Sequence, residues 1–519
     1  MEDLQFWDFA VIAAYFLIVT FIGYKTARGR TTPEELFLAG RTLGPMAIGF
    51  SLFASNISSD TLIGLPGAAY QHGISAANYE WMAGVVLMFT AIFVLPLLMR
   101  ARVTTMPELM ERRFDSRLRK YLSVITLFLS IILDTAGTLY AGGLIVTTFI
   151  PGTNLWEVCA LLALFTSIYT AFGGLRAVVY TDVMQACVLI GGSAAMTWII
   201  FGHFDHSWAN VKEAVSPEKL SLIRPLDDPS VPWLGLLTGV PIVGFYYWSM
   251  NQYVVQRLLG ARDIQAAGRA SVFAAALKLL PIFIMTIPGA MVVPLLPGLE
   301  HPDQVYPKMV QEFTPTGLTG LILAGLIAAL MSTLSSTLNS SATLLTLDFI
   351  KPARPNLTDA QLAKWGRVCT FILAAVAALW GPMIQYFSGL WAYLQQVFAF
   401  VASPLVATFL MGLWVKSLGA SAALRGLASG HALSAVLFVL VETGVLPIHF
   451  TIIGGILFAA TVLFTWFWMT RLGRHDRPAE KDARIAVIAK EGLERVPRDV
   501  MIGIAIVSVL TAVIVYLLR

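Results

Sequence analysis

Two polar clusters interrupt apolar stretches of this sequence, and both carry oxygen atoms that could bind a small hard cation. The first is SLFASNISSDTLIG at residues 51–64, and the second is STLSSTLNSS at residues 332–341. Hydrocarbon offers such groups no partners, so the first cluster predicts a broken helix whose freed carbonyls line a cavity. Hydroxyls of the second cluster recur on one helical face, although they can also close onto their own helix. Together the clusters predict a site for Na⁺.

Two charged side chains inside apolar sequence predict a cavity that offers both an acceptor and a donor. Glu80 lies in NYEWMAG, and Lys278 lies in AAALKLLPIF. Each would be costly against lipid. Alternatively, Glu80 could lie at the membrane interface, where local donors would hold its carboxylate. Lys278 could extend its side chain to the lipid headgroups. Together they favour a ligand with hydroxyl groups, because a polyol satisfies both.

Three further carboxylates and two aromatic rings leave alternatives open. Asp182 can be a helix-terminal carboxylate favoured by the dipole, and Asp60 can pair with an arginine or contact the site. Asp134 can bind substrate, carry a proton or pair internally. Tyr247 and Trp248 can belong to an aromatic belt, or they can stack on a sugar and block its inward exit.

The elements that must hold these residues are membrane helices. The chain has 519 residues, of which 57% are hydrophobic and 13% are charged, and this is too apolar for a soluble protein of this size. We predict an all-α polytopic membrane protein with about fourteen spans. The spans lie near residues 5–24, 45–72 (broken), 77–99, 118–149, 155–172, 179–203, 232–253, 268–297, 313–347, 364–386, 389–413, 422–442, 449–471 and 499–518.

Lysine and arginine gather in alternate loops, for example in residues 100–120, 257–269 and 351–367. The loops between them are acidic or neutral, as in residues 300–303. By the positive-inside rule, this pattern predicts that both termini are outside. We expect the protein in the plasma membrane, which in bacteria is the inner membrane.

Several classes of protein are disfavoured. Cys159, Cys187 and Cys369 form no CxxC or Cys/His pattern, so we expect neither a disulfide framework nor a zinc site. No basic tract interleaved with aromatics suggests a nucleic-acid partner. No nucleophile–base pair, metal motif or phosphate loop suggests an enzyme. The acidic start of the first span is unlike a cleavable signal peptide.

Spans two to six and seven to eleven form two successive groups of five. Groups of odd length have opposite topologies, which suits an inverted repeat with a substrate between its leading helices. The expected division is an N-terminal helix and loop (1–44), a first repeat (45–203), an extracellular loop (204–231), a second repeat (232–413) and C-terminal helices (414–519) with a cytoplasmic loop at 471–498.

Seven motifs resemble the sodium–solute symporter family, and the similarity covers roughly residues 5–470. The nearest resemblance is to its sugar carriers, the bacterial sodium/galactose and animal sodium/glucose symporters. The motifs are SLFASNIS, NYEWMAG, TTMPELMERRF, GGLRAVVYTD, YYWSMNQYVVQR, LKLLPIFIM and STLSSTLNSSATLLTLDF. The resemblance implies a leucine-transporter-type fold, which is a five-plus-five inverted repeat with extra helices at both ends.

The resemblance also implies two sodium sites and hence two Na⁺ per sugar. The core site would use carbonyls of Ala54, Ile57 and Ala329 with hydroxyls of Ser332 and Thr333. The second site would use Asp182, Ser332, Ser335 and Ser336.

The sugar site implied by the resemblance uses polar residues between an outer lid and an inner gate. Its binding residues are Asn56, Thr61, Glu80, Lys278 and Gln395, with Tyr247 stacked beneath; the lid is Leu65, Tyr79 and Trp391; Trp248 and Asn251 support the inner gate. Thr61, Ala83, Gly244 and Asp134 depart from the sugar carriers, which puts the identity of the substrate in doubt. The stretch DTAGT lacks the arginine of sialic-acid carriers, so an anionic substrate is disfavoured.

These observations predict a sodium-coupled symporter that imports a neutral hexose such as glucose or galactose by alternating access. Its partners would be the sugar, Na⁺ and the lipid bilayer, and a monomer would suffice for transport. Two alternatives stay open. One is a sodium symporter for another solute, such as inositol, an amino acid or a nucleoside. The other is a sugar-gated sensor or channel.

Overall fold

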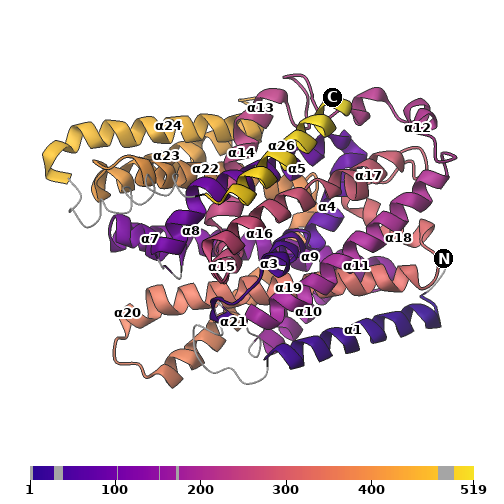
Figure 1. Cartoon of the computed structure of the whole chain (residues 1–519), viewed down its shortest axis with the longest axis horizontal. Helices are drawn as coiled ribbons and strands as arrows, with labels where there is room; N and C mark the ends of the chain where they lie inside the picture. The colour runs from indigo at the N-terminus through magenta and orange to yellow at the C-terminus, as the bar shows by residue number, and fades with distance from the viewer. Residues whose placement is uncertain are drawn as a thin grey trace.

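The structure, a computed structural model, is helical throughout the residues that it describes, which are 4–27, 39–101, 103, 105–150, 152–170, 175–476 and 496–519 (Figure 1). Ten of the described helices are long and apolar enough to cross a membrane, and two shorter apolar helices occupy Phe6–Val19 and Leu155–Ile168. The predicted number of fourteen also counts the broken segment at 45–72 and an irregular one at 232–253, so this number stays a prediction. Most of the predicted loop at 471–498 lies outside the described residues.

The helices follow the predicted order along the chain. In the first half they are α1 (Phe6–Ala27), η1 (Ala39–Arg41), α3 (Pro45–Asn56), α4 (Ser59–His72), η2 (Ile74–Ala77), α5 (Asn78–Phe89), η3 (Thr90–Val94), α6 (Leu95–Ala101), α7 (Met106–Arg113), α8 (Ser116–Phe128), η4 (Leu129–Thr135), α9 (Ala136–Phe149), α10 (Leu155–Thr170), α11 (Leu175–Gly202), α12 (Trp208–Ala214) and η5 (Pro217–Leu220). In the second half they are α13 (Trp233–Leu237), α14 (Gly239–Phe245), η6 (Tyr246–Met250), α15 (Gln252–Leu259), α16 (Ile264–Leu277), η7 (Ile282–Thr286), α17 (Ile287–Met291), η8 (Pro302–Gln304), α18 (Val305–Phe313), α19 (Leu318–Leu344), η9 (Leu345–Ile350), α20 (Lys351–Ala353), α21 (Asp359–Trp380), η10 (Gly381–Tyr386), α22 (Leu390–Trp414), α23 (Ala420–Glu442), α24 (Phe450–Leu472), η11 (Gly473–Asp476) and α26 (Arg498–Leu517).

The predicted break in the second span is present between α3 and α4. Ile57 has φ −84° and ψ 65°, and Ser58 is extended, so neither continues the helix. The hydroxyl of Thr61 donates to the carbonyl of Asn56 across the break at 2.7 Å. The two halves also have different surroundings, because α3 packs against α11 and α16 whereas α4 packs against α9, α17 and α22. The first polar cluster, at residues 51–64 of the second span, therefore lies at the centre of the bundle.

A glycine brings α4 close to α22. A Cβ at Gly64 would lie 3.1 Å from the backbone nitrogen of Trp391, which is tighter than ordinary van der Waals contact. The absence of a side chain at Gly64 thus lets the two helices meet beside the break.

Five short π-helical segments lie within or beside the long helices, namely η3, η4, η6, η7 and η9. A π segment adds one residue to a helical turn, displaces the side chains around it and is frequent at functional sites. Here η4 carries Asp134, η6 carries Tyr247 and Trp248, and η9 carries Asp348.

Two aspartates from other segments cap the N-termini of long helices. The carboxylate of Asp8, in α1, accepts from the backbone nitrogens of Gly317 and Gly320 at 2.7 and 2.9 Å, where α19 begins. The carboxylate of Asp303 accepts from the backbone nitrogen of Leu390 at 3.0 Å, where α22 begins. Each carboxylate satisfies orphan donors and complements the helix dipole.

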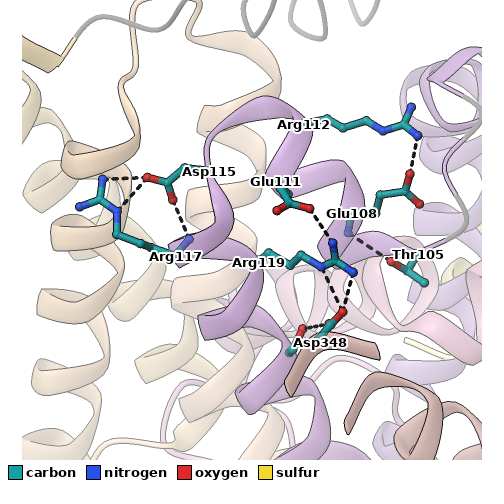
Figure 2. A network of polar contacts seen from close by, with 9 residues as sticks. Thr105, Glu108, Glu111, Arg112, Asp115, Arg117, Arg119 and Asp348 are labelled. Atoms are coloured by element: carbon teal, nitrogen blue, oxygen red, sulfur yellow. Dashed lines mark hydrogen bonds and ion pairs between the residues drawn. The ribbon is translucent and has the colours of Figure 1, made fainter. Parts of the chain in front are cut away.

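An ion-pair network joins α7 and α8 to the end of the α19–η9 helix (Figure 2). The guanidinium of Arg119 donates to Asp348 at 2.6 and 3.0 Å and to Glu111 at 2.6 Å. Ser123 donates to the second oxygen of Asp348, whose side chain is 3% exposed. The pair of Arg117 with Asp115, the N-cap residue of α8, is more exposed. The network thus holds three segments together through one buried carboxylate.

The predicted division of the chain, its inverted repeat and the side on which the termini lie stay predictions. In Figure 1, α7 and α20 lie toward the left of the view, whereas α12 and α17 lie toward the right. The helices α7 and α20, which carry Arg112, Arg113 and Lys351, therefore lie toward the same side of this view.

Candidate functional site

A cavity beside the broken helix brings together most of the residues predicted to bind a substrate. Five of the six predicted binding residues line it, and the sixth, Lys278, contacts two of them. Its lining residues are Asn56, Asp60, Thr61, Tyr79, Glu80, Ala83, Asp134, Val240, Val243, Gly244, Tyr247, Trp248, Trp391, Leu394, Gln395 and Phe398. The cavity is thus formed by α3, α4, α5, η4, α14, η6 and α22.

Lys278 and Glu80 form a buried ion pair at the wall of this cavity. The ammonium of Lys278 donates to the Glu80 carboxylate and to the side-chain oxygen of Asn56. It also lies 5.4 Å from the ring centroid of Trp248. Lys278 is 0% and Glu80 is 3% exposed, so the alternatives of a lysine extended to the headgroups and of an interfacial glutamate are both wrong. The pair compensates its own charge, and both oxygen-bearing partners of Lys278 line the cavity.

Two aromatic rings separate this cavity from a second one. The rings of Tyr79 and Trp391 meet edge to face, with centroids 5.7 Å apart and planes at 81°. Both residues line both cavities, and the second cavity also contains His72, Ser230 and His449. The Tyr79 hydroxyl and the Trp391 indole nitrogen find no hydrogen-bond partner among the described residues. The third predicted lid residue, Leu65, is fully buried and lines neither cavity.

The predicted inner gate is a cluster of packed rings on the other side of the cavity. The Tyr247 and Tyr253 hydroxyls are 2.5 Å apart, and Tyr247 packs edge to face on Phe398 with centroids 6.3 Å apart. Trp248 also contacts the Tyr247 ring. The alternative of an aromatic belt is wrong for Trp248, which is 2% exposed. The fifth gate residue, Asn251, lies where η6 ends and bonds to Asp134 through its side chain.

The predicted core sodium ligands lie on two segments that contact each other, because α19 packs against both α3 and α4. Within the described backbone, no N–H donates to the carbonyls of Ala54 or Ile57 across the break. Ala329, Ser332 and Thr333 stand on α19, and Thr333 is 6% exposed. Backbone carbonyls with hydroxyls make the all-oxygen donor set that a hard cation prefers.

At the second predicted sodium site, Asp182 contacts Ser332 directly and also contacts the guanidinium of Arg257, which was not expected there. Asp182 accepts from Ser332 at 2.8 Å, while the Ser335 hydroxyl closes onto the Ser332 carbonyl at 3.1 Å. No hydrogen bond joins the side chain of the fourth ligand, Ser336, to Asp182 within the described residues. Asp182 also accepts from Ser51 at 2.6 Å and from Arg257 at 3.3 Å.

Arg257 is the residue that sequence reasoning placed wrongly. The charge pattern put it among basic residues of a solvated loop, yet its side chain is 2% exposed and pairs with Asp182. The amphipathic helix α15 folds back beneath η6 and turns Arg257 inward. Its place at the end of the motif YYWSMNQYVVQR, residues 246–257, was the signal that could have indicated burial. Asp182 lies in the third turn of α11, so a terminal carboxylate favoured by the dipole is also the wrong interpretation.

A buried polar cavity flanked by packed rings, beside a broken helix, is typical of membrane transporters. The sodium:solute symporter family model matches residues 36–430. The chain belongs to the sodium:solute symporter family, and it is therefore a multi-pass transporter and not an enzyme.

Among its relatives, a sodium/glucose cotransporter of Vibrio parahaemolyticus is 32% identical over 456 residues, covering 82% of this chain and 84% of the relative. A sodium/mannose cotransporter of Bos taurus is 35% identical, covering 85% of this chain and 80% of the relative. A sodium/myo-inositol cotransporter of Mus musculus is 35% identical, covering 83% and 70%.

Two solved structures share the fold. A Na⁺-coupled sialic acid symporter in a substrate-bound outward-open state aligns with a TM-score of 0.77 at 22% identity, covering 91% of this chain and 99% of that one. The nucleobase-cation-symport-1 transporter Mhp1, in a closed conformation, aligns with a TM-score of 0.57 at 16% identity, covering 88% and 99%. At these identities the likeness concerns the fold alone.

Proposed function

We propose that this protein uses the sodium gradient to import a hexose-type polyol by alternating access. The observation that carries the proposal is the buried network of Glu80, Lys278 and Asn56 at a cavity that Gln395 also lines. Such a network offers acceptors and donors side by side, which is the pattern that adjacent sugar hydroxyls need. The names of the relatives, which mention glucose, mannose and myo-inositol, support the same class of solute.

Each part of the site has an expected task. Glu80 and Gln395 would accept from and donate to hydroxyls, with Asn56, Thr61 and Lys278 completing the hydrogen bonds. Tyr247 would pack against the sugar and block the inner exit. The unpartnered Tyr79 hydroxyl and Trp391 indole would donate to ligand oxygens as the outer lid closes. The described cavity lining contains no arginine, which disfavours an anionic substrate.

Sodium would act on the contact between the broken helix and α19. An ion bound by Ala54, Ile57, Ala329, Ser332 and Thr333 would hold α3 and α4 against α19 and favour the outward-open state. Coupling requires Na⁺ to bind this state more tightly than the inward one, since equal affinity for both would shift nothing.

We also propose a second ion at Asp182, Ser332, Ser335 and Ser336, so that two Na⁺ move with each sugar. The contact of Asp182 with Ser332 supports this site. Arg257 would have to share the carboxylate with the ion. The membrane potential contributes about 2.3 kcal/mol per charge per 100 mV, so a second ion would steepen accumulation. We further propose an inner-membrane location, termini outside and a functional monomer.

A binding experiment tests the proposal without relying on transport. The purified protein is heated in detergent with glucose, galactose, mannose or myo-inositol, in Na⁺ or in K⁺. We expect at least one of these solutes to raise the melting temperature in Na⁺ and to have little effect in K⁺. Stabilisation by a non-polyol solute, with no response to any polyol, would overturn the proposal.

A further inference from the structure

The substrate cavity carries three carboxylates, and only one of them has a cationic partner. Glu80 pairs with Lys278. Asp60 and Asp134 line the same cavity, and neither forms an ion pair with any described lysine, arginine or histidine. When both aspartates are ionised, the described lining of the cavity therefore carries a net negative charge.

Asp134 lines the cavity and has one carboxylate oxygen without a hydrogen-bond partner among the described residues. It stands in the π segment η4 and is 5% exposed. Its side chain bonds to the amide of Asn251, yet Oδ2 has no hydrogen-bond partner among the described residues. The carbonyl oxygen of the Asn251 side chain, in a residue 2% exposed, also has none.

Asp60 adds a second acceptor from the opposite element. It lies in the first turn of α4, where the helix dipole favours a negative charge, and its Oδ1 has no partner within the described chain. Asp60 and Asp134 lie close enough to repel each other. Tyr247 interacts with both of them, which places the two acids beside the ring predicted to carry the sugar.

The unpartnered carboxylate oxygens of Asp60 and Asp134, two residues that line one cavity, match a cation with several N–H donors better than another hydroxyl. A hydroxyl donates one hydrogen bond and leaves the charge uncompensated, whereas an ammonium donates three and carries the opposite charge. An unpaired carboxylate in a low-dielectric site is costly, so a ligand that neutralises it gains accordingly.

We propose that the preferred substrate is an aminohexose whose ammonium group binds Asp134, with Asp60 close by, while Glu80, Lys278 and Gln395 hold its hydroxyls. The inference rests on the proposed symport function and narrows its substrate class. It also gives a purpose to Asp134, one of the positions where the site departs from the sugar carriers that the sequence resembles.

The test compares amines with their parent sugars in proteoliposomes under an inward Na⁺ gradient, at neutral pH, where most of the amine carries its proton. Uptake is measured for glucosamine, galactosamine and mannosamine, for glucose, galactose and mannose, and for N-acetylglucosamine, which lacks the charge. We expect one amine to exceed its parent hexose at least about tenfold in initial rate at low concentration, which corresponds to about 1.4 kcal/mol. N-acetylglucosamine should not compete with that amine.

The matched variants are Asp134→Asn and, as an exposed carboxylate on α26, Asp499→Asn. Asp134→Asn should bring the amine-to-hexose ratio close to one, mainly by lowering amine uptake, and Asp499→Asn should leave the ratio unchanged. If Asp134→Asn does not fold, the ratio of amine uptake to hexose uptake in the wild-type protein decides whether the inference stands.

The outcomes separate the two proposals. Sodium-driven uptake of hexoses at least as fast as their amines, or a ratio that Asp134→Asn leaves unchanged, overturns this inference and leaves the symport function standing. Hexose uptake driven by a proton gradient that requires Asp134 also overturns it, because the aspartate would then be a proton site. Sodium-driven uptake of neither class overturns the function itself.

Discussion

Gln395 and Gln396 are neighbours in α22 with different surroundings. Gln395 lines the substrate cavity, whereas the Gln396 amide donates to Glu442 of α23 at 2.5 Å. We predict that Gln395→Ala raises the sugar concentration for half-maximal uptake about fivefold, because a hydrogen bond to the ligand is worth about 1 kcal/mol. Sodium binding should change little.

Gln396→Ala is the matched control, since it removes the same side chain from the same helix outside the cavity. Initial uptake rates over a range of sugar concentrations measure both variants. Equal effects of the two substitutions would show that Gln395 acts through helix packing and does not contact the sugar.

Thr333 is the cleanest test of the core sodium site. Thr333→Val keeps the shape of the side chain and removes the hydroxyl, and hydrogen bonds to charged groups are worth about 1.5–3 kcal/mol. We predict that the Na⁺ concentration for half-maximal uptake rises at least about tenfold. Ser340→Ala serves as control, because that hydroxyl closes onto Thr337 within α19.

At the residue scale, a charge that stands alone in apolar sequence is easier to recognise than a charge that stands among other basic residues. Glu80 and Lys278 stand out because each is a lone charge in apolar sequence, and that isolation made them candidates for the site. Arg257 does not stand out, because it follows a span together with Arg262 and Arg269 and resembles a loop residue. Only the fold shows that α15 turns it toward Asp182.

At the scale of elements, the Asp182–Arg257 pair joins α11 to α15 inside the protein, with 1% and 2% of the two side chains exposed. We predict that Arg257→Ala lowers the free energy of unfolding by about 3–5 kcal/mol, because it leaves a buried carboxylate uncompensated. Thermal unfolding in detergent without Na⁺ measures this loss.

Arg262→Ala is the control, since that side chain is 59% exposed and should change stability little. The double variant Asp182→Asn, Arg257→Met should recover much of the loss by removing both charges. A single Arg257→Ala variant as stable as wild type would contradict the ion pair.

The Arg119–Asp348 network of Figure 2 is predicted to hold the basic end of the bundle closed. Asp348→Asn weakens the contact of α8 with η9, so the inward-facing state should gain about 1–2 kcal/mol and the apparent Na⁺ affinity should fall. Arg117→Ala removes an exposed pair at the start of α8 and is the control.

Labelling of a cysteine introduced at Ala83 measures this shift. Ala83 lines the cavity, and the background lacks Cys159, Cys187 and Cys369. A membrane-impermeant thiol reagent added from the cytoplasmic side should react several-fold faster in Asp348→Asn than in Arg117→Ala. Equal labelling rates would show that the network does not bias the gate.

A break in a helix could be predicted where a polar cluster interrupts the apolar sequence. A change from α-helix to π-helix could not be predicted from the sequence. The break between α3 and α4 follows from residues 56–61, which no lipid-facing helix carries cheaply. The π segments η4 and η6 leave no mark in hydropathy, yet they aim Asp134 and Tyr247 at the cavity. The sequence therefore left the partner of Asp134 undecided.

At the scale of the whole molecule, the helix-rich membrane fold was predictable because hydrocarbon allows few alternatives to a helix. The family followed from motifs spread along the chain, and the match over residues 36–430 confirms it. The state of the gates was not predictable, because ring packing such as that of Tyr79 on Trp391 depends on side chains from distant elements. Substrate identity depends on the same long-range packing.

Solute accumulation in proteoliposomes tests the central claim, sodium-driven import, most directly. Radiolabelled hexoses and aminohexoses are supplied outside the vesicles with Na⁺, while the lumen contains K⁺. In the control, K⁺ replaces Na⁺ outside, so that both sides contain the same K⁺ concentration. The account predicts that at least one of these sugars rises above its external concentration, and that a sodium ionophore returns it to equilibrium. Uptake that only reaches equilibrium, with or without Na⁺, would contradict the account and indicate a channel or sensor.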